Sequence, residues 1–171
     1  LPGEGGNGDM APVSEEDEAV WRFARQQLSD ISDGKVGWER ILSGSGLELL
    51  YQAHCDKREP AMAAPDITAQ ALDNPQSLSG QVVEHFCKLL GQCAGNAALV
   101  TGARSGVYIA GGIIPRIIDL FMNSGFRSAF EARDKMAHYM ADIPTWLMLA
   151  GHPGLTGAAA WLKMHRQQRE G

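Results

Sequence analysis

A short apolar run that ends in two glycines does most to define the fold of this chain. It lies in Gly106–Arg116, GVYIAGGIIPR. The β-branched and aromatic residues of Val107–Ala110 predict a strand, and Pro115 is typical of a first helical turn. The strand would therefore pass through Gly111 and Gly112 into a helix. In α/β proteins such a junction brings backbone close to a nucleotide, because glycine has no side chain and the helix N-terminus offers free N–H groups.

Most of the remaining sequence has helical periodicity. A second strand is expected at 143–149, after a helical crossover from the first, and a short edge strand in the glycine-rich residues 1–13. The pattern predicts an α/β fold, rich in helix, with a small mixed sheet. The expected helices are 15–32, 36–42, 47–57, 66–72, 76–100, 115–122, 126–132, 134–140 and 155–166.

The longest expected helix, 76–100, has a face of small residues. Gly91 and Gly95 lie four apart on this face, with Ala94 and Ala98 beside them. Each internal glycine costs a helix about 1 kcal/mol relative to alanine. The pattern therefore predicts that another backbone passes close to this face, with a kinked helix as the alternative.

Composition and charge exclude several classes of function. The 171 residues are 44% hydrophobic with a net charge of -5, which is typical of one globular domain and argues against nucleic-acid binding. No apolar run approaches the ~20 residues that span a bilayer, and no signal peptide is visible. Cys55, Cys87 and Cys93 form no CxxC pair and no zinc-ligand spacing, so we expect reduced thiols, no metal site and a cytoplasmic protein.

The N-terminal glycines Gly3, Gly5 and Gly8 match the spacing GxGxxG. This spacing alone suggests a dinucleotide fingerprint. No strand precedes it in this chain, however, and Pro12 follows before any helix can begin. The context therefore argues against a Rossmann site.

Two carboxylates suggest recognition of a sugar. Glu4 lies on a glycine turn with Asn7 nearby; a carboxylate accepts hydrogen bonds from vicinal hydroxyls, and an amide both donates and accepts. Glu39 follows Trp38 in a helical segment. The residues alone leave two roles open for Glu39. One is a second sugar-binding carboxylate, and the other is a solvent-exposed helix residue paired with a neighbouring cation.

Four blocks, in this order and spacing, resemble the bacterial-type glucokinase family. They are LPGEGGNGDMAP, WERILSGSGLELLY, GVYIAGGIIPR and HPGLTGAAAWL, and the similarity covers nearly the whole chain. The family belongs to the actin, sugar kinase and Hsp70 superfamily. The resemblance therefore implies an RNase H-like lobe of a two-lobe kinase whose active site lies between the lobes.

The resemblance also implies roles for individual residues. Glu4 matches the glutamate of the GEGGH motif, which binds glucose hydroxyls, and Glu39 matches a second glucose-binding glutamate in the ERxLSG block. Gly111 and Gly112 match the adenosine motif. Asn7 stands where the family motif has histidine, which puts hexose affinity and selectivity in question.

The resemblance implies that the chain supplies only part of an active site. The family's phosphate loops and catalytic aspartate would lie upstream of Leu1, so no catalytic residue is expected here. Residues 1–171 would form the C-terminal large lobe, with part of the glucose site and the adenosine pocket, and helix 76–100 would cross the hinge. The implied cofactors are ATP and Mg²⁺, and the implied assembly is a homodimer.

Two other functions remain open. One is a non-catalytic, sugar-responsive regulator on the same fold, although the chain contains no cysteine-rich zinc motif and no DNA-binding module. The other is a mainly helical interaction domain in which Glu4 and Glu39 are ordinary surface residues.

Overall fold

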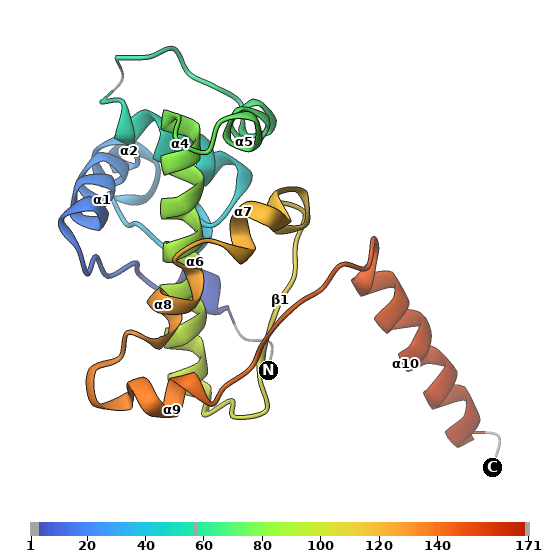
Figure 1. The fold of residues 1–171 in the computed structure, drawn as a ribbon. Helices are drawn as coiled ribbons and strands as arrows, with labels where there is room; N and C mark the ends of the chain where they lie inside the picture. The colour runs from blue at the N-terminus through green and yellow to red at the C-terminus, as the bar shows by residue number, and fades with distance from the viewer. Residues whose placement is uncertain (1–3, 57, 170–171) are drawn as a thin grey trace.

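One long helix, α6 (Leu78–Thr101), runs through the centre of the computed structural model, which describes residues 4–56 and 58–169 (Figure 1). Its start is capped by the Ser77 side chain, which accepts a hydrogen bond from the Gly80 amide. It ends at Gly102, whose left-handed conformation (φ 63°) stops the helix. Helices from both sides of it in the sequence pack around α6, which places most of its length in the core.

Two groups of elements pack around α6, one that precedes it in the sequence and one that follows it (Figure 1). Fully buried apolar side chains from both groups form one continuous core with α6, including Ile41, Leu50, Ile67 and Phe130. The first group is α1 (Glu15–Gln27), α2 (Ser29–Ser32), α3 (Trp38–Ile41), α4 (Gly44–His54) and α5 (Ala64–Asp73). The second is η2 (Ile114–Ile117), α7 (Ile118–Met122), α8 (Phe126–Glu131), η3 (Asp134–Met136) and α9 (Ala137–Ala141).

The small face of α6 lies directly against α8, as the glycine pattern predicted. A Cβ atom built on Gly91 would collide with the carbonyl oxygen of Phe126, and one on Gly95 would lie 2.7 Å from that of Phe130. Arg133 adds a polar link, since its guanidinium donates to the Gln92 carbonyl at 2.7 Å. The close backbone that explains these glycines therefore belongs to the same chain.

This contact makes Gly91 sensitive to the addition of one methyl group. We expect Gly91→Ala to lower the free energy of unfolding by about 1–2 kcal/mol, because overpacking typically costs 1–3 kcal/mol and alanine regains up to about 1 kcal/mol of helix propensity. Asn96→Ala on the exposed side of α6 is the control. Urea unfolding measures the free energy of unfolding of both variants. A Gly91→Ala protein as stable as the control would contradict the close packing.

The described sheet consists of β1 (Val107–Ile109) and β2 (Thr145–Leu147), which pair in parallel with Tyr108 opposite Trp146. Both strands lie within the expected segments. The expected edge strand near the N-terminus is reduced to a single antiparallel bridge between Asp9 and Gly37. Pro12 lacks the N–H that a longer ladder would need, so the pairing stops after this bridge.

Several helix boundaries differ from the sequence-based expectation. The helix expected from position 47 begins at Gly44, because the Ser43 hydroxyl caps its first turn by accepting from the Gly46 amide at 3.0 Å. Gly46 also lets the end of α3 approach, since a Cβ there would collide with the Ile41 carbonyl. The helix expected at 115–122 is divided into η2 and α7.

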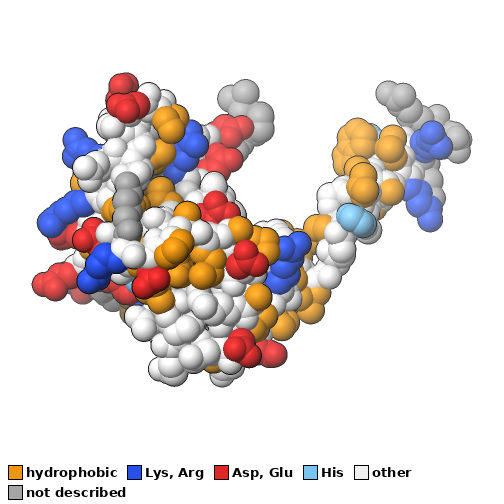
Figure 2. Space-filling model, turned by 90° about the horizontal axis from the view of Figure 1, so that it is seen from above, with side chains coloured by type: hydrophobic (Ala, Val, Ile, Leu, Met, Phe, Trp, Pro, Cys, Tyr) orange, Lys and Arg blue, Asp and Glu red, His pale blue; other side chains and the backbone are white. Residues whose placement is uncertain are grey.

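The last helix, α10 (Pro153–Arg169), extends away from the body of the molecule (Figure 1). Its described side chains are exposed or nearly so, including Leu155, Trp161, Leu162 and Met164. Figure 2 shows these apolar side chains on the projecting arm. No helix among the described residues is long and apolar enough to cross a membrane.

Candidate functional site

The glycine-rich N-terminal loop is held against the segment that precedes α3. Its turn, η1 (Gly5–Asn7), is followed by two backbone hydrogen bonds: the Trp38 amide donates to the Gly8 carbonyl at 3.0 Å, and the Met10 amide donates to the Val36 carbonyl at 2.8 Å. Met10 is buried and anchors the end of the loop. No helix opens from this turn, which agrees with the argument against a Rossmann site; Gly3 of that motif lies outside the described residues.

Glu39 lies beside this loop because α3 buries its opposite side. Trp38 and Ile41, three residues apart, are both buried, so Glu39 between them is exposed. A Cβ built on Gly6 would lie 3.8 Å from the Glu39 carboxylate oxygen Oε2. Two segments separated by some thirty residues of sequence thus meet, as a shared sugar site would require.

A polar cleft of about 550 Å³ lies at this meeting point. Asn7 and Glu39 both line it, and Glu4 adjoins it through Asn7, whose side-chain amide lies 3.5 Å from Glu4 Oε2. Carboxylate, amide and cationic groups around one cleft suit a ligand with several hydroxyls. The lining residues are Gly6, Asn7, Asp9, Lys35, Gly37, Glu39, Arg40, Ser43 and Ser45.

Gly112, the second glycine after β1, lines a second hollow of about 340 Å³, whereas Gly111 is not part of its lining. Gly111 has φ 135°, a conformation that side chains rarely adopt, whereas Gly112 has no such strain. No atom lies within 4 Å of a Cβ built on either glycine. Packing within the described chain therefore does not explain Gly112, and its bare backbone is free to lie against a ligand.

The two hollows meet at the first turn of α4. Ser43 and Ser45 line the polar cleft, while Gly44 between them lines the second hollow together with Gly112. The structure thereby places Glu39, a candidate sugar carboxylate, and Gly112, a candidate nucleotide glycine, in hollows that share one helical turn.

A second polar network is buried elsewhere, among residues for which no sequence pattern indicates such a role. Asp17 accepts hydrogen bonds from His85 Nε2 at 2.8 Å, Gln92 Nε2 at 2.9 Å and the Val13 amide at 3.1 Å. His85 Nδ1 in turn lies 2.9 Å from Nε2 of His54. Asp17 and His85 are 2% and 1% exposed, so the network joins α1, α4 and α6 inside the core.

Burial and hydrogen bonding determine how these groups titrate. Burial alone would raise the pKa of Asp17, but the bonds from His85, Gln92 and Val13 hold it well below its usual range. Burial and the neighbouring His85 lower the pKa of His54. Asp17 is therefore ionised at neutral pH, and His54 favours its neutral form.

The three cysteines are free, and two of them are protected from ionisation. Burial raises the pKa of Cys87 to about 12 and also raises the pKa of Cys93. Cys55 is buried as well. A buried neutral thiol is a poor nucleophile, as expected for small core residues.

Comparison with known proteins supports the resemblance seen in the sequence blocks. The glucokinase family model matches residues 1–165. This chain belongs to the glucokinase family. Glucokinases from Chromobacterium violaceum and Neisseria meningitidis serogroup C are 44% and 42% identical to it over 99% and 96% of its length. The chain spans about half the length of these curated relatives, 48% and 50%.

Solved glucokinase structures confirm the expected fold class. The crystal structure of a glucokinase from an Antarctic psychrotroph aligns with a TM-score of 0.84 at 30% identity, over 95% of this chain and 50% of that one. The glucokinase from Balamuthia mandrillaris, solved in complex with glucose, aligns with a TM-score of 0.69 at 20% identity, over 88% and 44%. The chain is thus a helix-rich α/β lobe of the sugar kinase type.

Proposed function

We propose that the protein phosphorylates the 6-hydroxyl of glucose with ATP, forming glucose 6-phosphate. In this proposal Glu4, Asn7 and Glu39 form part of the glucose site, and Gly111 and Gly112 border the adenosine pocket. The supporting observation is that the polar cleft and the glycine-lined hollow adjoin the same turn of α4. Membership of the glucokinase family supports glucose and ATP as the ligands of the two hollows.

The polar groups of the cleft suit this role chemically. Exposed carboxylates of Glu4 and Glu39 can each accept hydrogen bonds from sugar hydroxyls, and such charge-assisted bonds are stronger than neutral ones. Asn7 can donate and accept but cannot take up a proton, unlike the histidine of the family motif. We therefore propose that Asn7 positions a hydroxyl without titrating near neutral pH.

The described residues do not supply the whole reaction. Among them, the group of side chains that could hold a metal is Glu16, His54 and His85, whose two imidazoles do not suit Mg²⁺, a cation that prefers oxygen ligands. We propose that Mg²⁺ enters with the ATP phosphates. We further propose that residues 1–171 are the C-terminal large lobe, and that the general base and phosphate loops belong to a separate N-terminal lobe of a cytoplasmic homodimer.

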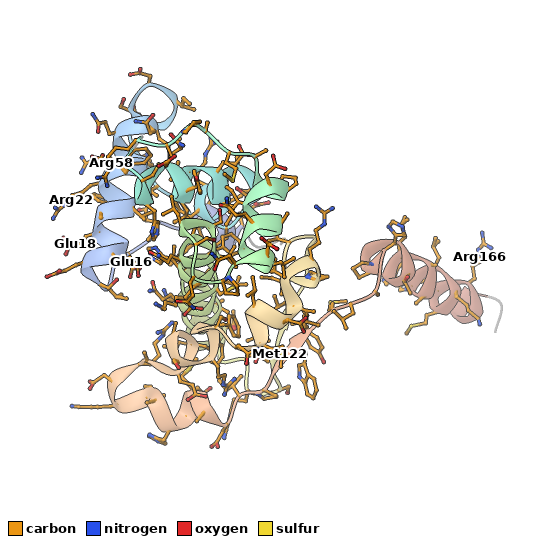
Figure 3. All side chains as sticks on the ribbon, turned by 45° about the horizontal axis from the view of Figure 1, so that its top comes forward. Glu16, Glu18, Arg22, Arg58, Met122 and Arg166 are labelled. Atoms are coloured by element: carbon orange, nitrogen blue, oxygen red, sulfur yellow. The ribbon has the colours of Figure 1, made fainter. Side chains whose placement is uncertain are left out.

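Exposed apolar side chains on the two strands, on α7 and on α10 form a surface that such a second lobe would cover. Tyr108 and Trp146, opposite each other on the two strands, are 67% and 51% exposed, and α10 carries further apolar side chains. Met122 on α7, labelled in Figure 3, is also exposed. A two-stranded sheet is marginal alone, so covering this surface would stabilise it.

The direct test is substrate binding and turnover by the full-length protein. Calorimetry with glucose, then with ATP, should show binding of both, and a coupled assay should detect glucose 6-phosphate. Sorbitol, which has no ring, serves as the control ligand. Glucose binding without turnover, together with binding to DNA, would favour the sugar-responsive regulator. If calorimetry detects binding of neither glucose nor ATP, the interaction domain would be favoured.

Gly112 allows a test of the nucleotide pocket that leaves the fold intact. Because its backbone is unstrained and its Cβ would face open space, Gly112→Ala should not change the melting temperature. A methyl group pressed against bound nucleotide should raise the KM for ATP about tenfold or more, since overpacking costs about 1–3 kcal/mol. Gly157→Ala on α10, also with an open Cβ position, is the control. An unchanged KM for ATP would remove Gly112 from the pocket.

A further inference from the structure

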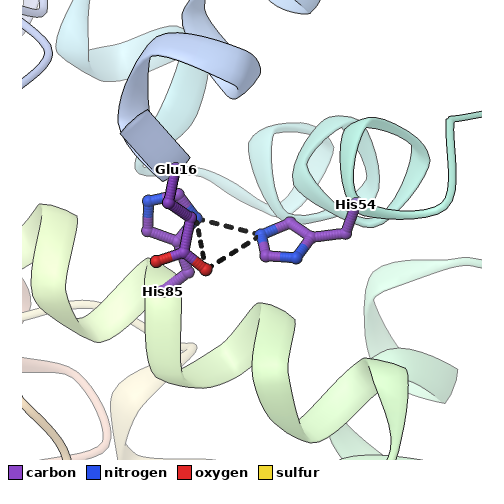
Figure 4. A group of neighbouring side chains, drawn as sticks. All are labelled: Glu16, His54 and His85. Carbon is purple, nitrogen blue, oxygen red and sulfur yellow. Dashed lines mark hydrogen bonds and ion pairs between the residues drawn. The ribbon is translucent and has the colours of Figure 1, made fainter. Parts of the chain in front are cut away.

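Three side chains from three helices place metal-ligating atoms around one point. Glu16 comes from the start of α1, His54 from the end of α4 and His85 from the middle of α6 (Figure 4). His54 Nε2 lies 2.9 Å from His85 Nδ1, and Glu16 Oε1 lies 3.7 Å from the same His85 atom and 4.0 Å from His54 Nε2. From this arrangement we propose that Glu16, His54 and His85 form a zinc-binding site.

The spacing of the three atoms suits zinc. Ligand atoms at 2.0–2.2 Å from a tetrahedral zinc ion lie about 3.3 Å from one another. The three observed distances lie on both sides of this value, so small side-chain rotations would bring all three atoms to bonding distance from one ion. Two imidazoles and one carboxylate leave the fourth position for water, a donor set that zinc commonly takes.

Asp17 prepares His85 to act as a ligand. Because its carboxylate accepts a hydrogen bond from His85 Nε2, the proton resides on Nε2, and the lone pair of Nδ1 faces His54 and Glu16. Carboxylate–histidine pairs of this kind orient metal ligands in known zinc sites. Asp17 is itself held by Gln92 and the Val13 amide, so His85 is fixed before any ion arrives.

The site is open to solvent and has suitable charge. The side chain of Glu16 is 47% exposed, and that of His54 is 11% exposed, so an ion can enter past Glu16. Figure 3 shows Glu16 on the body side of α1, whereas Glu18 and Arg22 point outward. Glu16 and Asp17 bring two negative charges. The nearby Lys88 ammonium opposes a cation, but it lies 3.7 Å from the Glu84 carboxylate, which offsets its charge.

In the metal-free protein the same atoms are joined by a hydrogen bond. With the His85 lone pair facing His54, the Nε2–H of His54 donates to it. Zinc would take the place of that proton on His54 Nε2, and the proton would move through solvent to Nδ1, so that His54 stays a neutral imidazole. A bound ion would then cross-link α1, α4 and α6.

Zinc titration of the chelator-treated protein, in competition with a chromophoric chelator, tests the proposal. We expect one zinc site that is weakened roughly 100-fold in His54→Gln and in Glu16→Gln, since even outer-shell changes at zinc sites cost 10–100-fold in affinity. His138→Gln, an exposed histidine on α9, is the matched control and should bind zinc like the wild type. Equal zinc affinity in all four proteins would overturn the proposal.

A second measurement guards against variants that fold poorly. Glu16 is half-exposed, so Glu16→Gln should keep the metal-free melting temperature of the wild type. Zinc should then raise the melting temperature of the wild type and of His138→Gln by several degrees, but not that of Glu16→Gln. If zinc shifts Glu16→Gln as much as the wild type, the three residues form a hydrogen-bonded cluster and not a metal site.

Discussion

Replacing Asp17 by alanine should lower the free energy of unfolding by about 3–5 kcal/mol. The substitution leaves two buried donors, His85 Nε2 and Gln92 Nε2, and the Val13 amide without their acceptor. Each unsatisfied buried group costs about 1–3 kcal/mol, and the two buried side-chain donors together with the Val13 amide account for the expected loss. Urea unfolding followed by tryptophan fluorescence measures the change.

Glu18 provides a matched control one residue further along the same helix. Its carboxylate pairs with Arg22 at 2.6 Å, but both side chains are more than half exposed, and both point away from the body in Figure 3. Glu18→Ala should therefore cost no more than about 1 kcal/mol. If Asp17→Ala is no more damaging than Glu18→Ala, the buried network contributes little to stability.

The same network predicts how stability depends on pH. The folded-state pKa values of His54 and Asp17 both lie below their ordinary values, so the unfolded chain binds more protons and acid favours unfolding. The His54 contribution should decline as the pH falls below about 6.5, and the Asp17 contribution as it falls below about 4. In Asp17→Ala the loss below pH 4 should be smaller than in the wild type.

Glu39→Gln should lower kcat/KM for glucose by about 5–150-fold in the full-length enzyme. The amide is close in shape to the carboxylate but loses its charge, and losing a hydrogen bond to a charged group costs about 1–3 kcal/mol. Because Glu39 is exposed on α3, the fold should not change. Steady-state kinetics with varied glucose measures the effect, and an unchanged melting temperature shows that it is local.

Glu4→Gln should have an effect of the same order, since Glu4 reaches the cleft through Asn7. Glu18→Gln on the outer face of α1 serves as the control and should leave kcat/KM unchanged. Normal rates in both Glu4→Gln and Glu39→Gln would show that the glucose site is wrongly assigned. A loss in Glu39→Gln alone would place the sugar nearer to α3 than to the N-terminal loop.

Local sequence signals were sufficient for much of the architecture. The run before Gly111 predicted β1, and Gly91 and Gly95 predicted a close backbone neighbour, because glycine in a helix interior is disfavoured unless something needs the space. The helix starts were less accurate. Ser43 moves the start of α4 to Gly44 through a hydrogen bond to the Gly46 amide, which hydrophobic periodicity does not register.

The candidate active site was predicted in part. Its residues were named from the sequence blocks, but the contact between the Gly6 region and Glu39, and the turn of α4 shared by the two hollows, required the structure. The Asp17–His85–His54 cluster had no such signal. Asp17 looked like an ordinary first-turn acid, which the dipole of a helix favours.

The sequence by itself determined the family, the helix-rich α/β class and the residues that carry the resemblance. Only the tertiary structure decided which polar groups are buried together. Asp17 and His85 are 68 residues apart, and His54 and His85 are 31 apart. The period of a helix specifies which face is buried, but the partner on another helix depends on how the helices pack against one another.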